Sequence, residues 1–186
     1  MDKSDEELVA EWQRGATAAY EALVRRHTPG VYSFVRRLIK DTDAAEDVSQ
    51  ETFVKAWRAL KQFRSGSRFT PWLFRIARNS ATDYLRKKKP QLFSSMQFDE
   101  QPFEETLRDV SPDAEEALIA AEESVMILKD IDTLSQSHQE ILMLRYQEGM
   151  TFEEAAEALQ ISVNTAKSRG RRALLALRSA MHPTHE

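Results

Sequence analysis

The chain has 186 residues, of which 41% are hydrophobic, 30% are charged and none is cysteine. This length can form one large domain or two small ones, and the lack of cysteine excludes disulfides, cysteine zinc sites and thiol nucleophiles. No apolar run approaches the roughly 18 residues of a membrane span, and the charged start MDKSDEEL does not resemble a signal peptide. We therefore expect a cytoplasmic protein without membrane insertion of its own.

The formal net charge of −4 conceals an uneven distribution. Between Gln97 and Glu123, ten acidic residues stand against one base, Arg108. Since the whole chain carries −4 and this segment −9, the other residues together carry +5. Such segregation is typical of a basic interaction surface joined to an acidic connector.

Helical periodicity dominates the first sixty residues. Glycine and proline are confined to a few boundaries and no segment alternates like a strand, so we predict an all-α protein. Ser4 and Glu7 form a capping box for a first helix. Two further helices are predicted over 16–27 and 31–39, separated by a break at the intervening Thr-Pro-Gly.

The predicted helix from Asp43 to Leu60 has two different faces. One arc is expected in the core: Ala45, Val48, Phe53, Ala56, Trp57, Ala59 and Leu60. The opposite arc combines charges with one valine: Asp47, Gln50, Glu51, Val54 and Arg58. Asp47 and Glu51 are a like-charge i,i+4 pair, which costs free energy unless a partner neutralises it. This arc could be a solvated face, but it favours a docking surface for another helix.

The stretch from Phe63 to Lys89 interleaves aromatic and basic residues, a combination suited to single-stranded nucleic acid. Unstacked bases could lie on exposed faces of Phe63, Phe69 or Trp72. The cations that could attract phosphates are Arg64, Arg68, Arg75, Arg78, Arg86, Lys87, Lys88 and Lys89. The alternative is an ordinary amphipathic stripe with a basic, solvated helix end.

After this stretch, residues 90–112 lose helical period and gather acids and prolines, which predicts an extended linker. A second helical domain begins near Asp113. Capping boxes are predicted at Ser137 with Glu140 and at Thr151 with Glu154.

The last two helices have the pattern of a helix-turn-helix. A short turn at Gln160 and Ile161 leads to Ser162, a good N-cap. Gly170 lies on the buried side of the last helix, where the missing side chain allows the preceding helix to cross closely. The opposite side is polar and then basic: Asn164, Thr165, Lys167, Ser168, Arg171 and Arg172, with Arg169 at its edge.

These segments together resemble the small extracytoplasmic-function (ECF) group of bacterial RNA polymerase sigma factors, in the sigma-70 family. DAAEDVSQETFVKAWRAL is similar to region 2.2, and FRSGSRFTPWLFRIARNSATDYLRKK is similar to regions 2.3 and 2.4. The segment from Leu134 to Leu174 is similar to region 4. The resemblance implies two helical domains, residues 1–89 and 113–182, joined by a flexible acidic linker over 90–112.

The resemblance also implies partners and site residues. Core RNA polymerase, through its beta-prime and beta subunits, would meet Asp47, Gln50, Glu51, Val54 and Arg58. The opened minus-ten strand of the promoter would meet Phe63, Ser65, Gly66, Ser67, Arg68, Phe69, Arg75, Arg78, Asn79 and Arg86. The minus-thirty-five duplex would meet Ser162, Asn164, Thr165, Lys167, Ser168, Arg169, Arg171 and Arg172. An anti-sigma factor is implied as the regulator.

Two other classes of protein remain. A stand-alone helix-turn-helix regulator would explain the last helices but not the docking arc or the aromatic and basic stretch. An enzyme is less favoured, because the four histidines lack metal-ligand spacing and no glycine-rich phosphate loop is present. No catalytic residue, metal or cofactor is therefore expected.

Overall fold

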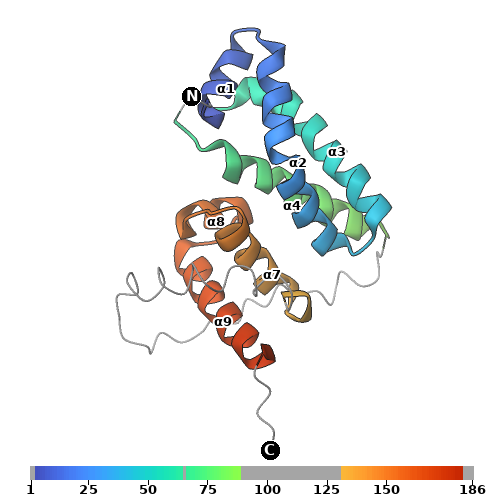
Figure 1. The fold of residues 1–186 in the computed structure, drawn as a ribbon, viewed down its shortest axis with the longest axis vertical. Coiled ribbons are helices and arrows are strands. Elements are labelled where there is room, and N and C mark those ends of the chain that lie inside the picture. The colour runs from blue at the N-terminus through green and yellow to red at the C-terminus, as the bar shows by residue number, and fades with distance from the viewer. Residues whose placement is uncertain (1–2, 65, 89–130, 182–186) are drawn as a thin grey trace, which may run out of the picture.

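The computed structural model describes residues 3–64, 66–88 and 131–181, and these residues form helices without a strand. The first half comprises α1 (Asp5–Gln13), α2 (Thr17–Ile39), α3 (Thr42–Ala59) and α4 (Phe69–Lys88), with the short 3-10 turn η1 (Leu60–Gln62) after α3. The second half comprises η2 (Ile131–Thr133), α7 (Gln136–Leu142), the π turn η3 (Met143–Gln147), α8 (Phe152–Leu159) and α9 (Val163–Met181). The two halves pack against each other, with α4 against α8 and α2 against α7 (Figure 1). The predicted linker and the start of the second domain lie outside the described residues, as do Ser65 and Lys89 of the first half.

Polar side chains cap the starts of α1, α3, α8 and α9. Ser4 and Glu7 cap α1 reciprocally, and Thr151 and Glu154 do the same for α8, so both of these predicted capping boxes are confirmed. The third predicted capping box is wrong. Ser135, and not Ser137, is the N-cap of α7, and the carboxylate of Glu140 pairs with Arg78 of α4. A charged arginine from another element offers a stronger hydrogen bond than a backbone amide.

The predicted break at Thr28-Pro29-Gly30 is also wrong, because α2 runs without interruption from Thr17 to Ile39. Pro29 cannot donate the helical backbone hydrogen bond to the carbonyl of Arg25, so the helix continues with one backbone hydrogen bond missing. Leu23 on one side of the proline and Phe34 on the other are both fully buried. Packing of this long apolar stripe outweighs the unfavourable proline.

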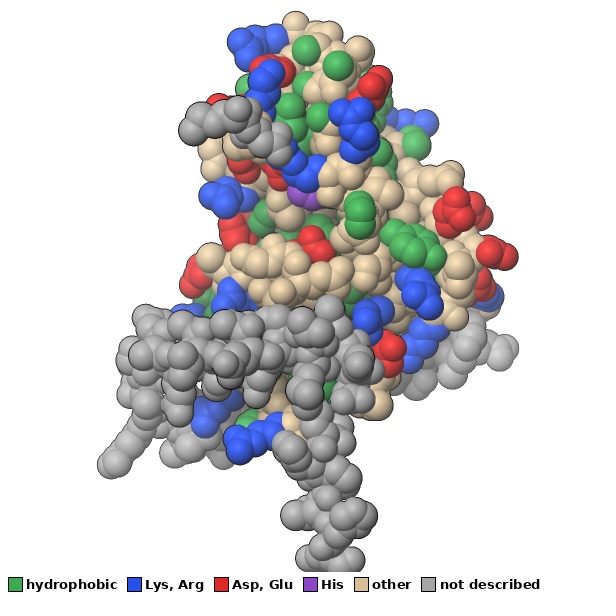
Figure 2. Space-filling model, viewed as in Figure 1, with side chains coloured by type: hydrophobic (Ala, Val, Ile, Leu, Met, Phe, Trp, Pro, Cys, Tyr) green, Lys and Arg blue, Asp and Glu red, His purple; other side chains and the backbone are tan. Residues whose placement is uncertain are grey.

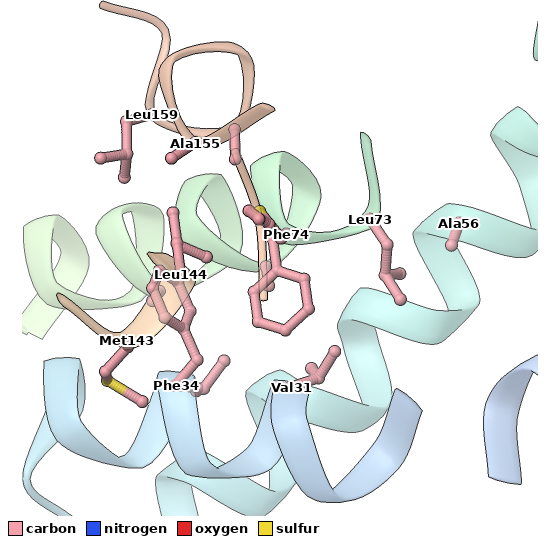
Figure 3. Close-up of a cluster of buried hydrophobic side chains, with 14 of the residues drawn as sticks. Val31, Phe34, Ala56, Leu73, Phe74, Met143, Leu144, Ala155 and Leu159 are labelled. Atoms are coloured by element: carbon pink, nitrogen blue, oxygen red, sulfur yellow. The ribbon is translucent and has the colours of Figure 1, made fainter. Parts of the chain in front are cut away.

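The core is continuous between the two halves. Figure 3 shows Phe74 of α4 surrounded by side chains of α2, of the segment 143–144 and of α8. Phe34, Phe74, Met143 and Leu144 are each no more than 1% exposed. The two helical units therefore share one apolar seam.

Candidate nucleic-acid interface

The charged arc of α3 is solvent-facing. All five side chains predicted to dock a partner are exposed, and Val54 in their midst is 48% exposed: Asp47, Gln50, Glu51, Val54 and Arg58. Lys55 pairs with Glu51 at 2.9 Å, which partly offsets the repulsion between Glu51 and Asp47. An exposed apolar residue inside a charged arc is the arrangement expected of a docking face.

The opposite arc is not wholly core. Trp57 is 39% exposed, so the prediction that it is buried is wrong. Its ring packs edge-on against Trp12 at 5.0 Å and Tyr20 at 4.8 Å between centroids. The position lies at the margin of the arc, where a large ring can cover neighbouring apolar surface without being enclosed itself.

The aromatic residues before and within α4 are not exposed platforms for bases. Phe69 is 1% exposed and Phe63 is 9% exposed, which corrects the prediction that their faces are open. The ring of Phe63 lies 6.2 Å from Phe69 and 5.2 Å from Trp72, which is half-buried. These rings gain more from packing together than from facing water, and they fix both ends of the loop 64–68.

The loop and the outer face of α4 carry the accessible polar groups. Gly66 has a φ of +88°, a backbone conformation that glycine adopts without strain. Arg68, Asn79 and Arg86 are exposed, and Ser67 is half-buried. The amide of Asn79 can donate and accept hydrogen bonds, which is what recognition of a base edge requires.

Three of the predicted strand-binding arginines lie at the contact with the second half, and one of them, Arg68, lies 3.2 Å from Glu154 of α8. The guanidinium of Arg78 lies 3.1 Å from the carboxylate of Glu140 and donates to the carbonyl of Leu159 at 3.2 Å. Arg75 lies 3.9 Å from Glu157. The sequence pattern gave no signal for these partners, because they are 62 or more positions away in the chain.

A partly buried polar cluster holds the start of α1 against α2 and α4. The carboxylate of Asp5 contacts His27 at 2.7 Å and Arg26 at 2.5 Å, and Thr70 donates to it at 3.1 Å. Burial raises the pKa of Asp5, but the hydrogen bonds and charges of His27 and Arg26 outweigh burial and bring that pKa down to about 2. Sequence reasoning placed His27 at a helix end and missed this cluster, since it expected α2 to stop there.

The helix-turn-helix of the sequence prediction is formed by α8 and α9. Gln160 adopts the left-handed conformation, with φ of 55°, and the hydroxyl of Ser162 accepts a hydrogen bond from the amide of Thr165 at 3.0 Å. Gly170 is buried beside Phe152 of α8, as predicted from its place on the buried line.

The polar face of α9 is open to solvent, with one exception. Thr165 is half-buried, and six of the predicted duplex-binding residues are exposed: Ser162, Asn164, Lys167, Ser168, Arg171 and Arg172. Arg169, predicted at the edge of this face, is only 6% exposed and so lies on the buried side of that edge. It lies three residues after Ala166 and four before Ala173, both fully buried, and therefore shares their side of the helix.

Other kinds of site are not found in the described residues. They contain no group of three or more His, Cys, Asp or Glu side chains placed to hold a metal ion. Among these same residues, no helix is long and apolar enough to span a membrane.

The described residues thus form a helical protein with an exposed charged arc on α3, a loop followed by a basic helix, and a capped helix-turn-helix, a combination typical of DNA-binding proteins. Models of sigma-70 region 2 and sigma-70 region 4 match residues 23–91 and 131–179. The chain is 35% identical to the RNA polymerase sigma-H factor of Pseudomonas aeruginosa, covering 97% of this chain and 95% of that one. It is 33% identical to the ECF RNA polymerase sigma-E factor of Escherichia coli strain K12, with the same coverage.

Two solved structures are also similar. One is CnrH in complex with the cytosolic domain of CnrY, with a TM-score of 0.68, 26% identity and coverage of 98% of this chain and 100% of that one. The other is the sigma factor RpoE in complex with the anti-sigma factor NepR from Bartonella quintana, with a TM-score of 0.62, 26% identity and coverage of 87% and 96%.

This chain belongs to the sigma-70 family of bacterial RNA polymerase sigma factors, in its extracytoplasmic-function group. It is a transcription initiation factor that directs RNA polymerase to promoters. The stand-alone helix-turn-helix regulator is not favoured, since region 2 accounts for the first half of the chain.

Proposed function

We propose that the exposed arc of α3 is the surface that binds core RNA polymerase. The acids and Val54 of this arc would meet a basic and apolar helix, and the family resemblance points to the beta-prime coiled coil. The beta subunit is the expected second contact. The residues are Asp47, Gln50, Glu51, Val54 and Arg58, all exposed.

The loop 64–68 and α4 would contact the opened minus-ten strand. Flipping a base out of the stack costs a few kcal/mol, which contacts to the flipped base must offset. The exposed amide of Asn79 suits a base edge, and the exposed Arg68 and Arg86 suit phosphates. Phe63 and Phe69 would position the loop rather than stack on bases, because both are buried. The proposed strand site also includes Ser65, Gly66, Ser67, Arg75 and Arg78.

The polar face of α9 would contact the minus-thirty-five duplex. The short side chains near its N-terminus would approach base edges in the major groove, and Arg171 and Arg172 in the next turns would contact phosphates. Ser162, Asn164, Thr165, Lys167 and Ser168 form the N-terminal part of this site. Arg169 would support the helix from its buried side.

The remaining parts of the proposal concern the organisation and control of the chain. Residues 1–89 and 113–182 would be the two DNA-binding domains, joined by 90–112. An anti-sigma factor would hold the protein inactive, as the similarity to a sigma factor solved with NepR supports. The protein would act in the cytoplasm, where promoters and polymerase meet, without a catalytic step or cofactor of its own.

The observation that carries the proposal is Val54, a large apolar side chain 48% exposed among charges on a helix that matches region 2. Val54→Asp should weaken binding to core polymerase about tenfold or more, since it places a charge in the centre of a desolvated contact. Binding is measured with purified core enzyme, together with transcription from promoter DNA.

Ala18→Asp on α2 is the matched control, because Ala18 is also exposed but lies outside the docking arc. It should bind core polymerase like the unaltered chain. Equal affinities of Val54→Asp and Ala18→Asp for core polymerase would show that the α3 arc is not the binding surface. Failure of the unaltered chain to bind core polymerase would overturn the whole proposal.

A further inference from the structure

The loop 64–68 of the proposed strand site is held at its start by a side chain of α1. The side-chain amide of Gln13 donates to the backbone carbonyls of Leu60 and Phe63, each at 3.1 Å. Leu60 and Phe63 are both buried, so these carbonyls belong to residues anchored in the core. One amide thus ties the last residue before the loop to the end of α1.

The other end of the loop is held by the first turn of α1. Phe69 opens α4, and its backbone N–H donates to the carboxylate of Glu6 at 3.2 Å. The first four N–H groups of a helix lack intrahelical partners, and side-chain oxygens usually accept from them. Arg68, which precedes α4, offers only donors. Glu6 therefore supplies an acceptor from another helix.

The position of α1 is itself fixed by packing and by polar contacts. Its buried residues are Leu8, Val9 and Trp12. Glu6 and Gln13 are seven positions apart, so they lie on the same face and about 10 Å apart along the helix axis. The two ends of the loop are consequently held at a fixed separation.

The tip of the loop is open. A Cβ added to Gly66 would meet nothing within 4 Å, and Arg68 is exposed. Within the loop, the amide of Ser67 donates to the carbonyl of Arg64 at 3.2 Å. A loop with a tip in open space takes its position from its ends, and α1 holds both of them.

The acids of α1 do not suit a strand contact of their own. In the space-filling view, acidic and basic side chains lie close together at the upper left of the molecule, where Figure 1 places α1 and the start of α4 (Figure 2). Glu6 would repel phosphates there, and it also lies 3.9 Å from Arg68. If charge were its only role, removal of Glu6 would strengthen strand binding. A positioning role predicts the opposite effect on recognition.

We propose that α1 positions the loop 64–68 for recognition of the opened strand, with Glu6 and Gln13 as the positioning residues at its two ends. This rests on the proposed strand site. Neither side chain touches the strand. They hold the loop in place before the strand arrives, so binding does not have to supply the free energy of ordering it.

The test measures which bases the polymerase complex selects. The full chain with core RNA polymerase is mixed with single-stranded oligonucleotides of random sequence, and the bound strands are sequenced. Glu6→Ala and Gln13→Ala should each lower the enrichment of the preferred base at the most selective position about tenfold, roughly the discrimination of one pair of base-edge hydrogen bonds. The salt dependence of total strand binding should stay unchanged, because no phosphate contact is lost.

Two controls accompany these variants. Glu6→Gln removes the same charge as Glu6→Ala but keeps an oxygen that can accept from the N–H of Phe69, so it should retain the enrichment. Glu153→Ala removes an acid from an exposed position of α8 and should behave like the unaltered chain. All the variants should bind core polymerase normally, since the α3 arc is unchanged, and this binding shows that they are folded.

Unchanged enrichment in both Glu6→Ala and Gln13→Ala would overturn the inference. A loss in Glu6→Gln as large as that in Glu6→Ala would also overturn it, because the charge and not the hydrogen bond would then be responsible. Asn79→Ala separates the inference from the proposed function. If Asn79→Ala lowers the enrichment and the α1 variants do not, the strand site stands and only the positioning role fails. If the unaltered complex enriches no base, the strand site fails and the inference falls with it.

Discussion

Gly170 occupies the position in α9 where a side chain has least room. A Cβ there would lie 2.8 Å from the ring of Phe152 and 3.8 Å from Ile141. The guanidinium of Arg145 also lies 4.3 Å from the centroid of the Phe152 ring. This contact restricts how far the ring can move away from a new Cβ. The crossing of α8 and α9 therefore depends on one missing methyl group.

Gly170→Ala should lower the stability of the protein. Alanine gains roughly 1 kcal/mol of helix propensity over glycine, but overpacking costs about 1–3 kcal/mol, so a net loss of about 1 kcal/mol is expected. Thermal unfolding measures this loss. Gly30→Ala in α2 is the contrasting variant, because the atoms nearest to its new Cβ belong to the movable carboxylate of Glu148 and not to a ring. A Gly170→Ala chain as stable as Gly30→Ala would contradict the crowding at Phe152.

Helical geometry predicts the exposure of the α3 arc, and all five of its residues are exposed. Helical geometry does not predict that Phe63, Phe69 and Arg169 are buried. Whether a residue at the edge of a face is covered depends on which other element packs there.

At the scale of the element, tertiary packing determines the length of α2, whereas local sequence determines where α9 begins. Helix α2 passes through Pro29 because a long apolar stripe packs on both sides of it, which local propensity could not predict. The start of α9 is determined locally, since Ser162 caps it directly after the left-handed residue Gln160. The capped starts of α1, α8 and α9 were predicted from adjacent residues, whereas the start of α7 and the passage of α2 through Pro29 were not.

The basic face of α9 predicts a salt-dependent contact. Arg171→Ala should weaken binding of the polymerase complex to promoter duplex and reduce the slope of log affinity against log salt by about 1, since one phosphate contact is lost. Binding is measured at several salt concentrations. Leu175→Ala serves as the control, because Leu175 is exposed on α9 without a charge. An unchanged slope in Arg171→Ala would show that this arginine makes no phosphate contact.

At the scale of the whole molecule, the contact between the halves also contains an unfavourable group. Glu148 borders a cavity of about 140 Å³ that is lined as well by Asp5, Glu6, Arg68 and Glu154. Burial raises the pKa of Glu148, and the charge of His27 opposes this to a lesser degree. The ionised carboxylate of Glu148 thus costs free energy where the halves meet.

Glu148→Gln should stabilise the protein at neutral pH and not in acid. A carboxyl whose folded pKa is raised adds stability below its ordinary pKa of 4.5 and loses it as the pH rises through the folded value. Glu148→Gln does not lose stability in this way, because glutamine does not ionise. A rise in Tm of about 2–4 °C at pH 7 corresponds to roughly 1 kcal/mol in a chain of this size.

The control for this prediction is Glu153→Gln, which removes the same charge from an exposed position and should leave Tm nearly unchanged. Scanning calorimetry at pH 7 and below pH 4.5 compares the two variants. A stabilisation by Glu148→Gln that persists at the lower pH would show that ionisation of Glu148 is not its cause.

The sequence by itself determined the helical class, the capping of α1, α8 and α9, the exposed arc of α3 and the membership of the family. These features depend on periodicity and on contacts within a few residues, which local sequence encodes. Only the tertiary structure decided that α2 continues through Pro29, that Phe69 and Arg169 are buried, and that Glu140 pairs with Arg78. Each of these depends on packing between segments distant in sequence, which no local pattern specifies.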